Sequence, residues 1–393
     1  MNRLVSAASL FFLLAVAPAQ AATCGGDFNQ WLNGVFQEAR AAGVSDRAIR
    51  TATPQMVYDK KIISRDRAQG VFAQTFLEFS GRMVSSYRLK TGGGNLQKYA
   101  NIFRAVEQKY GVPGPVITAF WALETDFGAV QGDFQTFTAL TTLSYDCRRP
   151  ELFRPQLIAA LKLLDHGDLP ISDFVGAWAG EIGQTQILPK DYIAYGIDFD
   201  GDGKVDLKRS TPDVIATAGH FIQGLGWRRG EPWLEEVQVP ANMNWEEARL
   251  DNKLSRADWA ARGVRRADGG ALTKDGLPAS LLLPMGHSGP AFLAYPNFDV
   301  YLEWNKSLVY CTTAAYLATR LAGASKVSSG ANPPGLSLNE MKALQRALQA
   351  RGYHVGDVDG ILGENTRAAV RQEQKRLGLP ADGWPTQTLV SGL

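Results

Sequence analysis

Apolar residues recur three and four positions apart along much of the chain, which is the spacing of one face of an α-helix. Residues 153–164 show this pattern, and Gly167 follows as a stop signal. A second run, opened by a Thr-Pro pair that suits a helix start, occupies residues 211–224, and a third covers 308–321. The body of the protein, about residues 28–321, is therefore predicted to be mostly helical.

Alternating patterns typical of β-strands are scarce. The best short matches are residues 237–239 and 279–283. Residues 242–284 are dense in Trp, Gly and charged side chains, so we expect an irregular or separately folded insertion there.

The hydrophobic pattern changes in the last 70 residues. Residues 324–335 lack apolar periodicity and carry Ser, Gly and Pro, which predicts a linker. Residues 336–393 contain two helical patterns around a segment rich in Gly and Asp. An Asp-Gly pair at 359–360 recurs at 382–383, each followed by a Thr, which indicates a weak internal duplication.

The amino terminus has the features of a secretory signal segment. Arg3 precedes the apolar run 10–16, and small residues lead to an expected cleavage after Ala21, which defines residues 1–21 as the signal. The apolar run is shorter than the roughly 20 residues that a spanning helix needs, so we expect no membrane span. An uncleaved anchor and a lipid-modified Cys24 are the alternatives.

The chain has three cysteines, so at most one pair can form within it. Cys311 lies in a helical pattern among small and apolar residues, where a buried free thiol is expected. Cys24 and Cys147 lie in polar, turn-like surroundings, and export would permit a disulfide. We predict that they pair, which mass mapping of the non-reduced protein would test.

Composition limits the partners. At about 100 to 200 residues per domain, 393 residues predict two or three domains. The 41 basic and 39 acidic side chains leave a net charge of +2, and no run of five basic residues occurs, so we expect no nucleic-acid partner. An apolar share of 45% excludes a disordered chain.

Common catalytic motifs are missing from the sequence. There is no Walker A loop, no dinucleotide fingerprint, no His-Glu-x-x-His and no Gly-x-Ser-x-Gly. The four histidines are far apart and lack the spacing of metal ligands. Carboxylate chemistry is what remains.

Glu124 is the leading candidate for that chemistry. It ends a predicted helix over 116–124, and Ile117, Phe120 and Trp121 lie seven, four and three positions before it, so its carboxyl lies on the apolar stripe. Such surroundings disfavour the charged form and raise the pKa of a carboxyl toward that of a general acid. The alternative is a carboxylate at a frayed helix end, turned to solvent.

Three blocks carry a family resemblance. Residues 121–128 contain Glu-Thr-x-x-Gly, residues 179–189 contain Ala-Gly-x-x-Gly-x-x-Gln-x-x-Pro, and residues 304–310 begin Trp-Asn-Lys-Ser and end in Tyr. In this order they resemble the lytic murein transglycosylases of the membrane-bound B type. Residues 336–393 resemble a three-helix peptidoglycan-binding domain through Gly352-Tyr353 and the two Asp-Gly pairs.

The resemblance implies a mainly α (α+β) protein: a lysozyme-like catalytic domain over 22–323 with a small insertion, a linker over 324–335 and a peptidoglycan-binding domain over 336–393. It implies non-hydrolytic cleavage of the β-1,4 bond between N-acetylmuramic acid and N-acetylglucosamine, without a cofactor. Glu124 would protonate the leaving oxygen, then take the proton of the muramyl C6 hydroxyl as it closes on C1 to a 1,6-anhydro sugar. Glu124 alone would serve both steps, whereas glycosidases generally use two carboxyl groups to cleave the bond.

The resemblance also assigns substrate binding to Gln186, Asn305 and Tyr310, with Trp304 where the family commonly has Tyr. Loop or helix capping is the alternative for Gln186 and Asn305, and packing is the alternative for Tyr310.

The second block departs from the family pattern. Ala177 replaces an expected Ser, and Glu181-Ile182 replaces the usual Ala-Met. Glu181 could contact the substrate or act as a base for water, which would allow partial hydrolysis.

Residues 198–206 have the oxygen spacing of a calcium loop, with Gly203 at its sharp turn. The ligand residues would be Asp198, Asp200, Asp202, Lys204 and Asp206. Arg209 occupies the position of the usual bidentate Glu. The resemblance implies a structural Ca²⁺ here with a later aspartate, for which Asp213 is the candidate. An acidic turn without an ion is the alternative.

These features together predict a periplasmic, monomeric lytic transglycosylase acting on peptidoglycan glycan strands. A hydrolytic muramidase and a wall-binding scaffold with a decayed catalytic domain are the alternatives. Ala177 favours decay, whereas the retained Glu124 argues against it.

Overall fold

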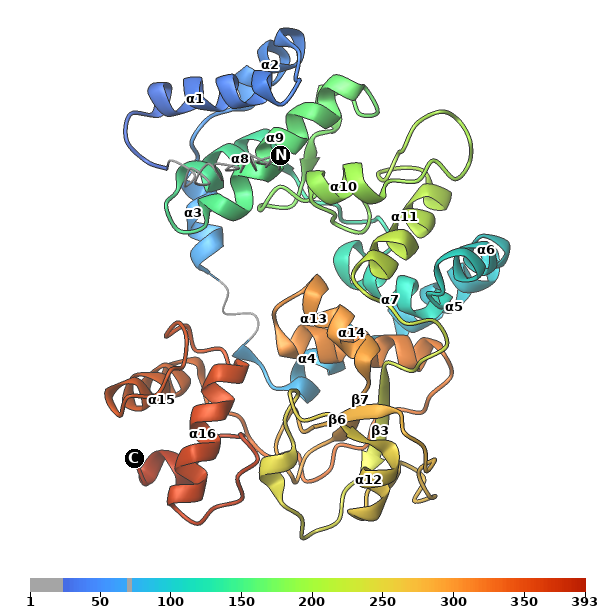
Figure 1. Ribbon diagram of the computed structural model, residues 1–393, viewed down its shortest axis with the longest axis vertical. Helices are drawn as coiled ribbons and strands as arrows, with labels where there is room; N and C mark the ends of the chain where they lie inside the picture. The colour runs from blue at the N-terminus through green and yellow to red at the C-terminus, as the bar shows by residue number, and fades with distance from the viewer. Residues whose placement is uncertain (1–23, 69–72) are drawn as a thin grey trace, which may run out of the picture.

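The computed structural model describes residues 24–68 and 73–393, so the predicted signal segment lies outside the described residues. Helices dominate (Figure 1). They are α1 (Phe28–Ala41), α2 (Asp46–Ala52), α3 (Lys60–Arg67), α4 (Phe76–Met83), α5 (Ser86–Lys98), α6 (Ala100–Tyr110), α7 (Gly114–Thr125), α8 (Thr136–Tyr145), α9 (Pro150–His166), α10 (Pro189–Tyr195), α11 (Thr211–Gly224), α12 (Arg256–Ala261), α13 (Pro296–Trp304), α14 (Leu308–Leu321), α15 (Leu338–Ala350), α16 (Glu364–Arg376) and α17 (Gln387–Ser391). The strands are β1 (Phe134–Gln135), β2 (Val175–Gly176), β3 (Leu234–Gln238), β4 (Leu254–Ser255), β5 (Arg265–Arg266), β6 (Pro278–Leu282) and β7 (Ala291–Ala294).

Helix α7 lies at the centre of the catalytic region. It packs against α14 and α5, with α11 beside it (Figure 1). Every residue of α7 is buried except Pro115 and Glu124, which are half-buried. A helix that is apolar on all sides belongs in a core, so this helix offers a rigid mount for one polar side chain.

The predicted helices over 153–164 and 308–321 are confirmed as α9 and α14, and Gly167 caps α9 in a left-handed conformation with φ of 94°. The helix predicted over 211–224 is confirmed as α11, but the opening Thr is not its N-cap. Its N-cap is Ser210, whose hydroxyl accepts the N–H of Asp213, while Thr211 is the first helical residue.

The segment predicted as an insertion belongs to a five-stranded antiparallel sheet of order β4-β6-β7-β3-β5. Leu234 of β3 pairs with Ala294 of β7, and Ser280 of β6 pairs with Ala294 from the other side. Trp259 of α12 is buried against this sheet in a cluster separate from the main core. The insertion is therefore folded rather than irregular, and it is larger than predicted.

The carboxyl-terminal module has its own apolar core, made by residues of α15, α16 and α17. The segment over 324–335 has no helix or strand, as predicted for a linker. It does not leave the module loose, however. The N–H of Val327 donates to the Tyr316 hydroxyl at 3.1 Å, that of Ser328 to Glu236 at 2.8 Å, and that of Ala331 to the Ser288 carbonyl at 2.8 Å.

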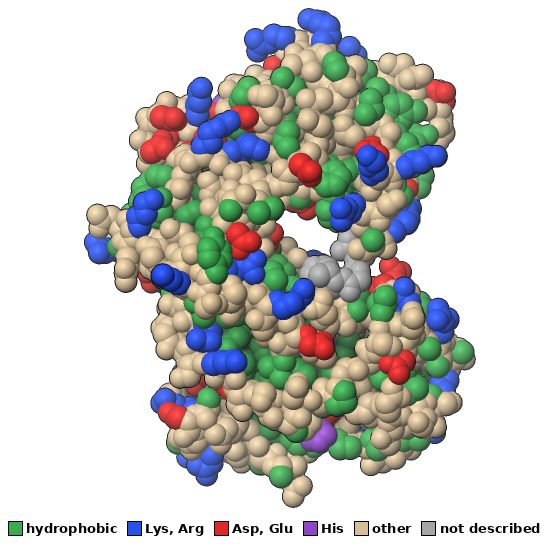
Figure 2. All heavy atoms as spheres, turned by 180° about the vertical axis from the view of Figure 1, so that it is seen from behind, with side chains coloured by type: hydrophobic (Ala, Val, Ile, Leu, Met, Phe, Trp, Pro, Cys, Tyr) green, Lys and Arg blue, Asp and Glu red, His purple; other side chains and the backbone are tan. Residues whose placement is uncertain are grey.

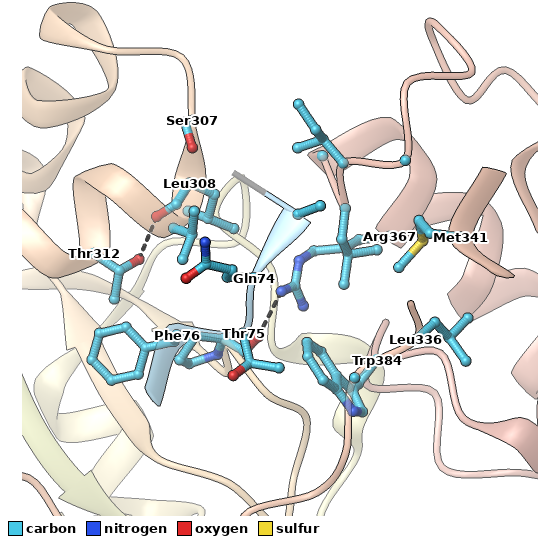
Figure 3. Close-up of a pocket in the computed structure, with 18 of the residues that line it drawn as sticks. Gln74, Thr75, Phe76, Ser307, Leu308, Thr312, Leu336, Met341, Arg367 and Trp384 are labelled. Atoms are coloured by element: carbon cyan, nitrogen blue, oxygen red, sulfur yellow. Dashed lines mark hydrogen bonds between the residues drawn. The ribbon is translucent and has the colours of Figure 1, made fainter. Parts of the chain in front are cut away.

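The module is fixed to the insertion by buried polar contacts. Arg367 of α16, 5% exposed, donates to the backbone carbonyls of Leu283 and Pro284. Burial lowers the pKa of its guanidinium to about 10. Asp382 accepts from both the backbone N–H and the ring of His287. Figure 3 shows Arg367 and Trp384 facing the start of α4 and the start of α14.

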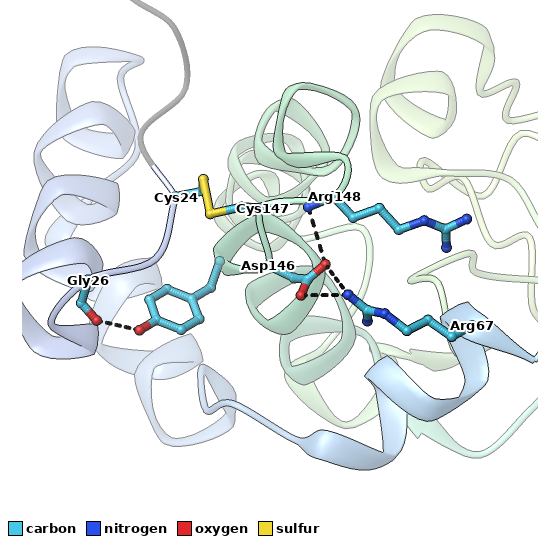
Figure 4. The surroundings of a disulfide bond; sticks show 7 residues. Cys24, Gly26, Arg67, Asp146, Cys147 and Arg148 are labelled. Atoms are coloured by element: carbon cyan, nitrogen blue, oxygen red, sulfur yellow. Dashed lines mark hydrogen bonds and ion pairs between the residues drawn. A yellow bond between two sulfur atoms is a disulfide. The ribbon is translucent and has the colours of Figure 1, made fainter. Parts of the chain in front are cut away.

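Cys24 and Cys147 form the disulfide that was predicted, joining the segment before α1 to the loop between α8 and α9 (Figure 4). Nearby, the Tyr145 hydroxyl donates to the carbonyl of Gly26 at 2.5 Å. Cys311 is a buried free thiol. No helix among the described residues is long and apolar enough to cross a bilayer.

Candidate active site

Glu124 lies in the last turn of α7, where two side chains from a distant part of the chain meet it. The indole Nε1 of Trp304 donates to Glu124 Oε1 at 2.9 Å, and the hydroxyl of Tyr310 donates to the same oxygen. Oε2 accepts no hydrogen bond from residues 24–68 or 73–393. One oxygen is thus held by the protein, and the other is left for a proton or a substrate atom.

Two opposing effects set the acidity of Glu124. Burial raises the pKa of its carboxyl, and the hydrogen bonds from Tyr310 and Trp304 lower it. Burial is the larger effect, so the pKa lies above its ordinary value. A carboxyl tuned in this way keeps its proton closer to neutral pH, as a general acid requires.

The sequence assigned Trp304 and Tyr310 to substrate binding, and the structure places both against Glu124. The Trp304 ring stacks on Phe120 with centroids 4.1 Å apart, which fixes the orientation of its N–H. Burial raises the pKa of the Tyr310 phenol well above its usual value, so this group stays protonated as a donor. Chain patterning alone could not place these donors, because about 180 residues separate them from Glu124.

The second block, residues 179–189, is attached to the end of α7. The Trp121 indole donates to Gln184 Oε1 at 2.9 Å, and the Thr125 hydroxyl donates to the Gln184 carbonyl at 2.5 Å. Gly128 has φ of 88°, and a Cβ there would lie 2.5 Å from Gln184 Oε1. This position therefore needs glycine both for its backbone and for space. Helix α7 itself ends before this glycine, at the C-cap Asp126, which has φ of 50°.

Gln186 has its side chain turned to the loop itself. Its Nε2 donates to the carbonyls of Gly183 at 2.8 Å and Gln131 at 3.2 Å. Asn305 Oδ1 accepts the N–H of Ser307 at 2.8 Å, just before α14 begins. Both amides thus make the local capping contacts that were the alternative to substrate binding.

Glu181 is the second carboxyl near the site. Its Oε2 is buried and has no hydrogen-bond partner among the described residues. Burial, together with the nearby charge of Glu124, raises its pKa to about 7. Its backbone is fixed by a hydrogen bond from the Ala177 N–H to the Glu181 carbonyl at 3.1 Å.

The acidic loop brings three of the predicted calcium ligands together. Carboxylate oxygens of Asp198, Asp200 and Asp202 lie within 4.8 Å of one another, and all three residues are exposed. Oxygen donors of this kind suit Ca²⁺. Lys204 keeps its predicted place in the loop, where its backbone N–H donates to Asp202.

Asp206 and Asp213 do not join that group. Asp206 accepts from Arg209 Nη1 at 3.0 Å. Asp213 is buried, and its carboxylate accepts the backbone N–H groups of Phe199 and Asp206 at 2.8 Å and 2.9 Å. The Asp213 carboxylate therefore holds the loop by accepting its backbone N–H groups, a contact that the family resemblance did not indicate.

Comparison with known proteins identifies the family of the chain. A model of the transglycosylase SLT domain matches residues 27–319, and one of a peptidoglycan binding domain matches residues 337–390. The chain is 27% identical to membrane-bound lytic murein transglycosylase B of Escherichia coli strain K12 over 63% of this chain and 67% of that protein.

Solved structures are similar over longer stretches. SltB3 of Pseudomonas aeruginosa, solved with NAG-anhNAM-pentapeptide and with NAG-NAM-pentapeptide, is 37% identical over 93% of this chain and 99% of that chain, with TM-scores of 0.85 and 0.86. Slt35 of Escherichia coli, solved with calcium, shares the fold at 24% identity and a TM-score of 0.63, over 78% of this chain and 97% of that chain. The chain belongs to the transglycosylase SLT domain family and is a lytic transglycosylase of peptidoglycan with a peptidoglycan-binding domain.

Proposed function

We propose that the enzyme cleaves the β-1,4 bond between N-acetylmuramic acid and N-acetylglucosamine without water, leaving 1,6-anhydro-muramyl ends, and that Glu124 is both the acid and the base. The observation that carries the proposal is the state of Glu124: one buried carboxyl with a raised pKa and with two donors on a single oxygen. Such a group can give up a proton and then remain as a stabilised carboxylate.

The reaction needs two proton transfers. Protonated Glu124 gives its proton to the glycosidic oxygen as the bond from that oxygen to muramyl C1 breaks. The muramyl C6 hydroxyl then bonds to C1, and its proton returns to the Glu124 carboxylate. No water is consumed, and the enzyme ends in its starting protonation state.

Trp304 and Tyr310 act on Glu124 rather than on the sugar. Their hydrogen bonds strengthen when Glu124 becomes a carboxylate, because bonds to an ionised acceptor are stronger than neutral ones. They therefore stabilise the state between the two proton transfers and keep Oε2 free for the substrate.

The sugars would lie along the half-buried indole of Trp178 and near Asn305, which line one cavity together with Trp304. Aromatic faces bind sugar rings by stacking and burial of apolar surface. Gln186 and Asn305 would reach the substrate only with the oxygens or N–H groups that their capping contacts leave free.

Glu181 supports hydrolysis as a second, minor reaction of the same site. Below about pH 7 it is largely protonated, and above that pH it becomes a carboxylate close to Glu124. A carboxylate there could take a proton from water, giving reducing ends beside anhydro ends. If Glu181→Ala changes neither the ratio of the two ends nor the rate, Glu181 has no such role.

The proposal also includes a structural Ca²⁺ and a periplasmic location, which are supported by other parts of the chain. The loop of Asp198, Asp200 and Asp202 would hold Ca²⁺ as a structural ion that takes no part in the chemistry. The predicted signal segment and the Cys24 to Cys147 disulfide support export to the periplasm.

Digestion of purified sacculi by the wild-type protein and by Glu124→Gln tests the proposal. Gln keeps the shape of the side chain and has no proton to give, so release of anhydro-muramyl products should be lost while binding to sacculi persists. Release at the wild-type rate by Glu124→Gln would overturn the assignment.

A further inference from the structure

Gln184 lies in the loop over residues 179–189 and takes no part in either proton transfer. A glycan can reach the protein only from its surface, which is hollowed between the two halves of the molecule (Figure 2). Gln184 is 6% exposed, and both ends of its side-chain amide are bonded to protein groups. Any part that it plays in catalysis therefore acts through other residues.

On one side, Gln184 is bonded to the helix that carries Glu124. Its Oε1 accepts the indole N–H of Trp121 at 2.9 Å, and its backbone carbonyl accepts the Thr125 hydroxyl at 2.5 Å. These two donors lie three residues before Glu124 and one residue after it. Because α7 ends at Thr125, side-chain contacts rather than a further helical turn hold this end of the helix. The two contacts thus fix how its last turn is rotated.

On the other side, Gln184 is bonded to residues 207–208, directly after the acidic loop. Its backbone N–H donates to the Leu207 carbonyl at 2.8 Å, and its Nε2 donates to the Lys208 carbonyl at 3.0 Å. This segment is itself fixed, since Leu207 is fully buried and the Lys208 ammonium donates to the Val175 carbonyl at 2.7 Å. Gln184 therefore joins the end of α7 to a rigid support.

The side chain between these partners must accept and donate at once. An indole N–H can only donate and a peptide carbonyl can only accept, so Trp121 needs an acceptor and Lys208 needs a donor. A carboxamide supplies both. A carboxylate would accept from Trp121 but would place an oxygen lone pair against the Lys208 carbonyl, whereas a protonated carboxyl would satisfy both partners.

The orientation of α7 matters because Glu124 meets its donors from a different part of the chain. Trp304 belongs to α13 and Tyr310 to α14, and both donate to Oε1 of Glu124. A rotation of the last turn of α7 would lengthen these hydrogen bonds and move Oε2 relative to the bound sugar. A displacement of about 1 Å at a reacting group can cost about 100-fold in rate.

We propose that Gln184 is a positioning residue for Glu124, whose side-chain amide holds the last turn of α7 against residues 207–208. This inference rests on the proposed function, because it assigns Gln184 a part in the chemistry of Glu124. Since Gln184 does not touch the sugar, its loss should lower kcat and leave KM nearly unchanged.

Steady-state kinetics on a soluble glycan test this inference in two variants. Gln184→Met keeps the length of the side chain and removes both polar groups, so kcat should fall about 10- to 100-fold at every pH. Gln184→Glu should approach the wild-type kcat at pH 5, where burial keeps the introduced carboxyl protonated, and should fall toward that of Gln184→Met at pH 8. Each rate is divided by that of the wild-type protein at the same pH, which cancels the titration of Glu124 and of Glu181.

Gln156 provides a matched control. It is also 6% exposed, and its Oε1 accepts the backbone N–H of Lys190, a contact that joins α9 to α10. A carboxylate can accept this N–H as well as an amide can. Gln156→Met and Gln156→Glu should therefore keep the wild-type kcat at both pH values. Thermal melting verifies that all four variants are folded.

An unchanged kcat in Gln184→Met, or the same ratio to wild type for Gln184→Glu at pH 5 and pH 8, would overturn the inference. The inactivity of Glu124→Gln would in that case still support the proposed chemistry. If Gln184→Met does not fold, Gln184→Glu decides, since it matches the amide at pH 5. Full activity of Glu124→Gln would instead overturn the proposed function.

Discussion

The hydroxyl of Tyr310 donates to the oxygen of Glu124 that the protein holds, so Tyr310→Phe removes one donor and little else. A hydrogen bond to a charged group contributes about 1.5 to 3 kcal/mol. At 1.36 kcal/mol per pH unit, losing it should raise the pKa of Glu124 by about one to two. The sign follows from the contact, because this donor stabilises the carboxylate and so lowers the pKa.

Two kinetic effects should follow. Since Glu124 must be protonated to begin the reaction, the alkaline limb of the kcat/KM profile should move to higher pH by about one to two units. The maximal rate should fall about tenfold or more, because the carboxylate formed by the first proton transfer loses its donor. The assay is release of anhydro-muramyl products from a soluble glycan between pH 4 and pH 9.

Tyr301 provides a matched control. It lies in α13, is fully buried, and its hydroxyl has no hydrogen-bond partner among the described residues. Tyr301→Phe makes the same chemical change in the same core, yet it should leave the pH profile in place. If Tyr310→Phe behaves like Tyr301→Phe, the role given to Tyr310 is wrong.

Three further perturbations have expected outcomes. Folding raises the pKa of the Glu181 carboxyl from 4.5 to about 7, so its contribution to stability is present below pH 4.5 and is lost as pH rises through 7. Glu181→Gln should therefore raise the free energy of unfolding by up to about 3 kcal/mol at pH 8, and by less at pH 5. The melting temperature measures this gain, and an equal rise at the two pH values would contradict the raised pKa of Glu181. Gly128→Ala should abolish activity, because its Cβ would meet Gln184, whereas Gly81→Ala in α4 meets nothing and should be neutral or stabilising in the same activity and melting assays. Calcium should raise the melting temperature of the wild-type protein and not of Asp200→Asn; a transition insensitive to chelator and to added calcium would count against the loop as a calcium site.

Local patterning predicted the helices well, because each is determined by neighbours in the chain. Helix α14 has the predicted bounds, and the apolar surroundings of Glu124 could be read from residues three, four and seven positions away. The sheet was harder to predict. Its strands are two to five residues long, and β3 and β7 pair across more than 50 residues, so no local period reveals the pairing.

Side-chain partners depended on contacts that spacing cannot supply. Trp304 and Tyr310 were identified as site residues, but their hydrogen bonds to Glu124 were not predicted, since these depend on the packing of α7 with α14. Asp213 was named as a candidate calcium ligand from the family resemblance, and in the structure its buried carboxylate accepts backbone N–H groups.

The most direct test of the proposed chemistry is digestion of sacculi in water labelled with oxygen-18, followed by mass spectrometry of the released muropeptides. Closure of the muramyl C6 hydroxyl on C1 uses no water, so the wild-type products should be unlabelled anhydro species, and Glu124→Gln should yield none. Reducing ends carrying the label as the main product would contradict the account and identify the enzyme as a hydrolase.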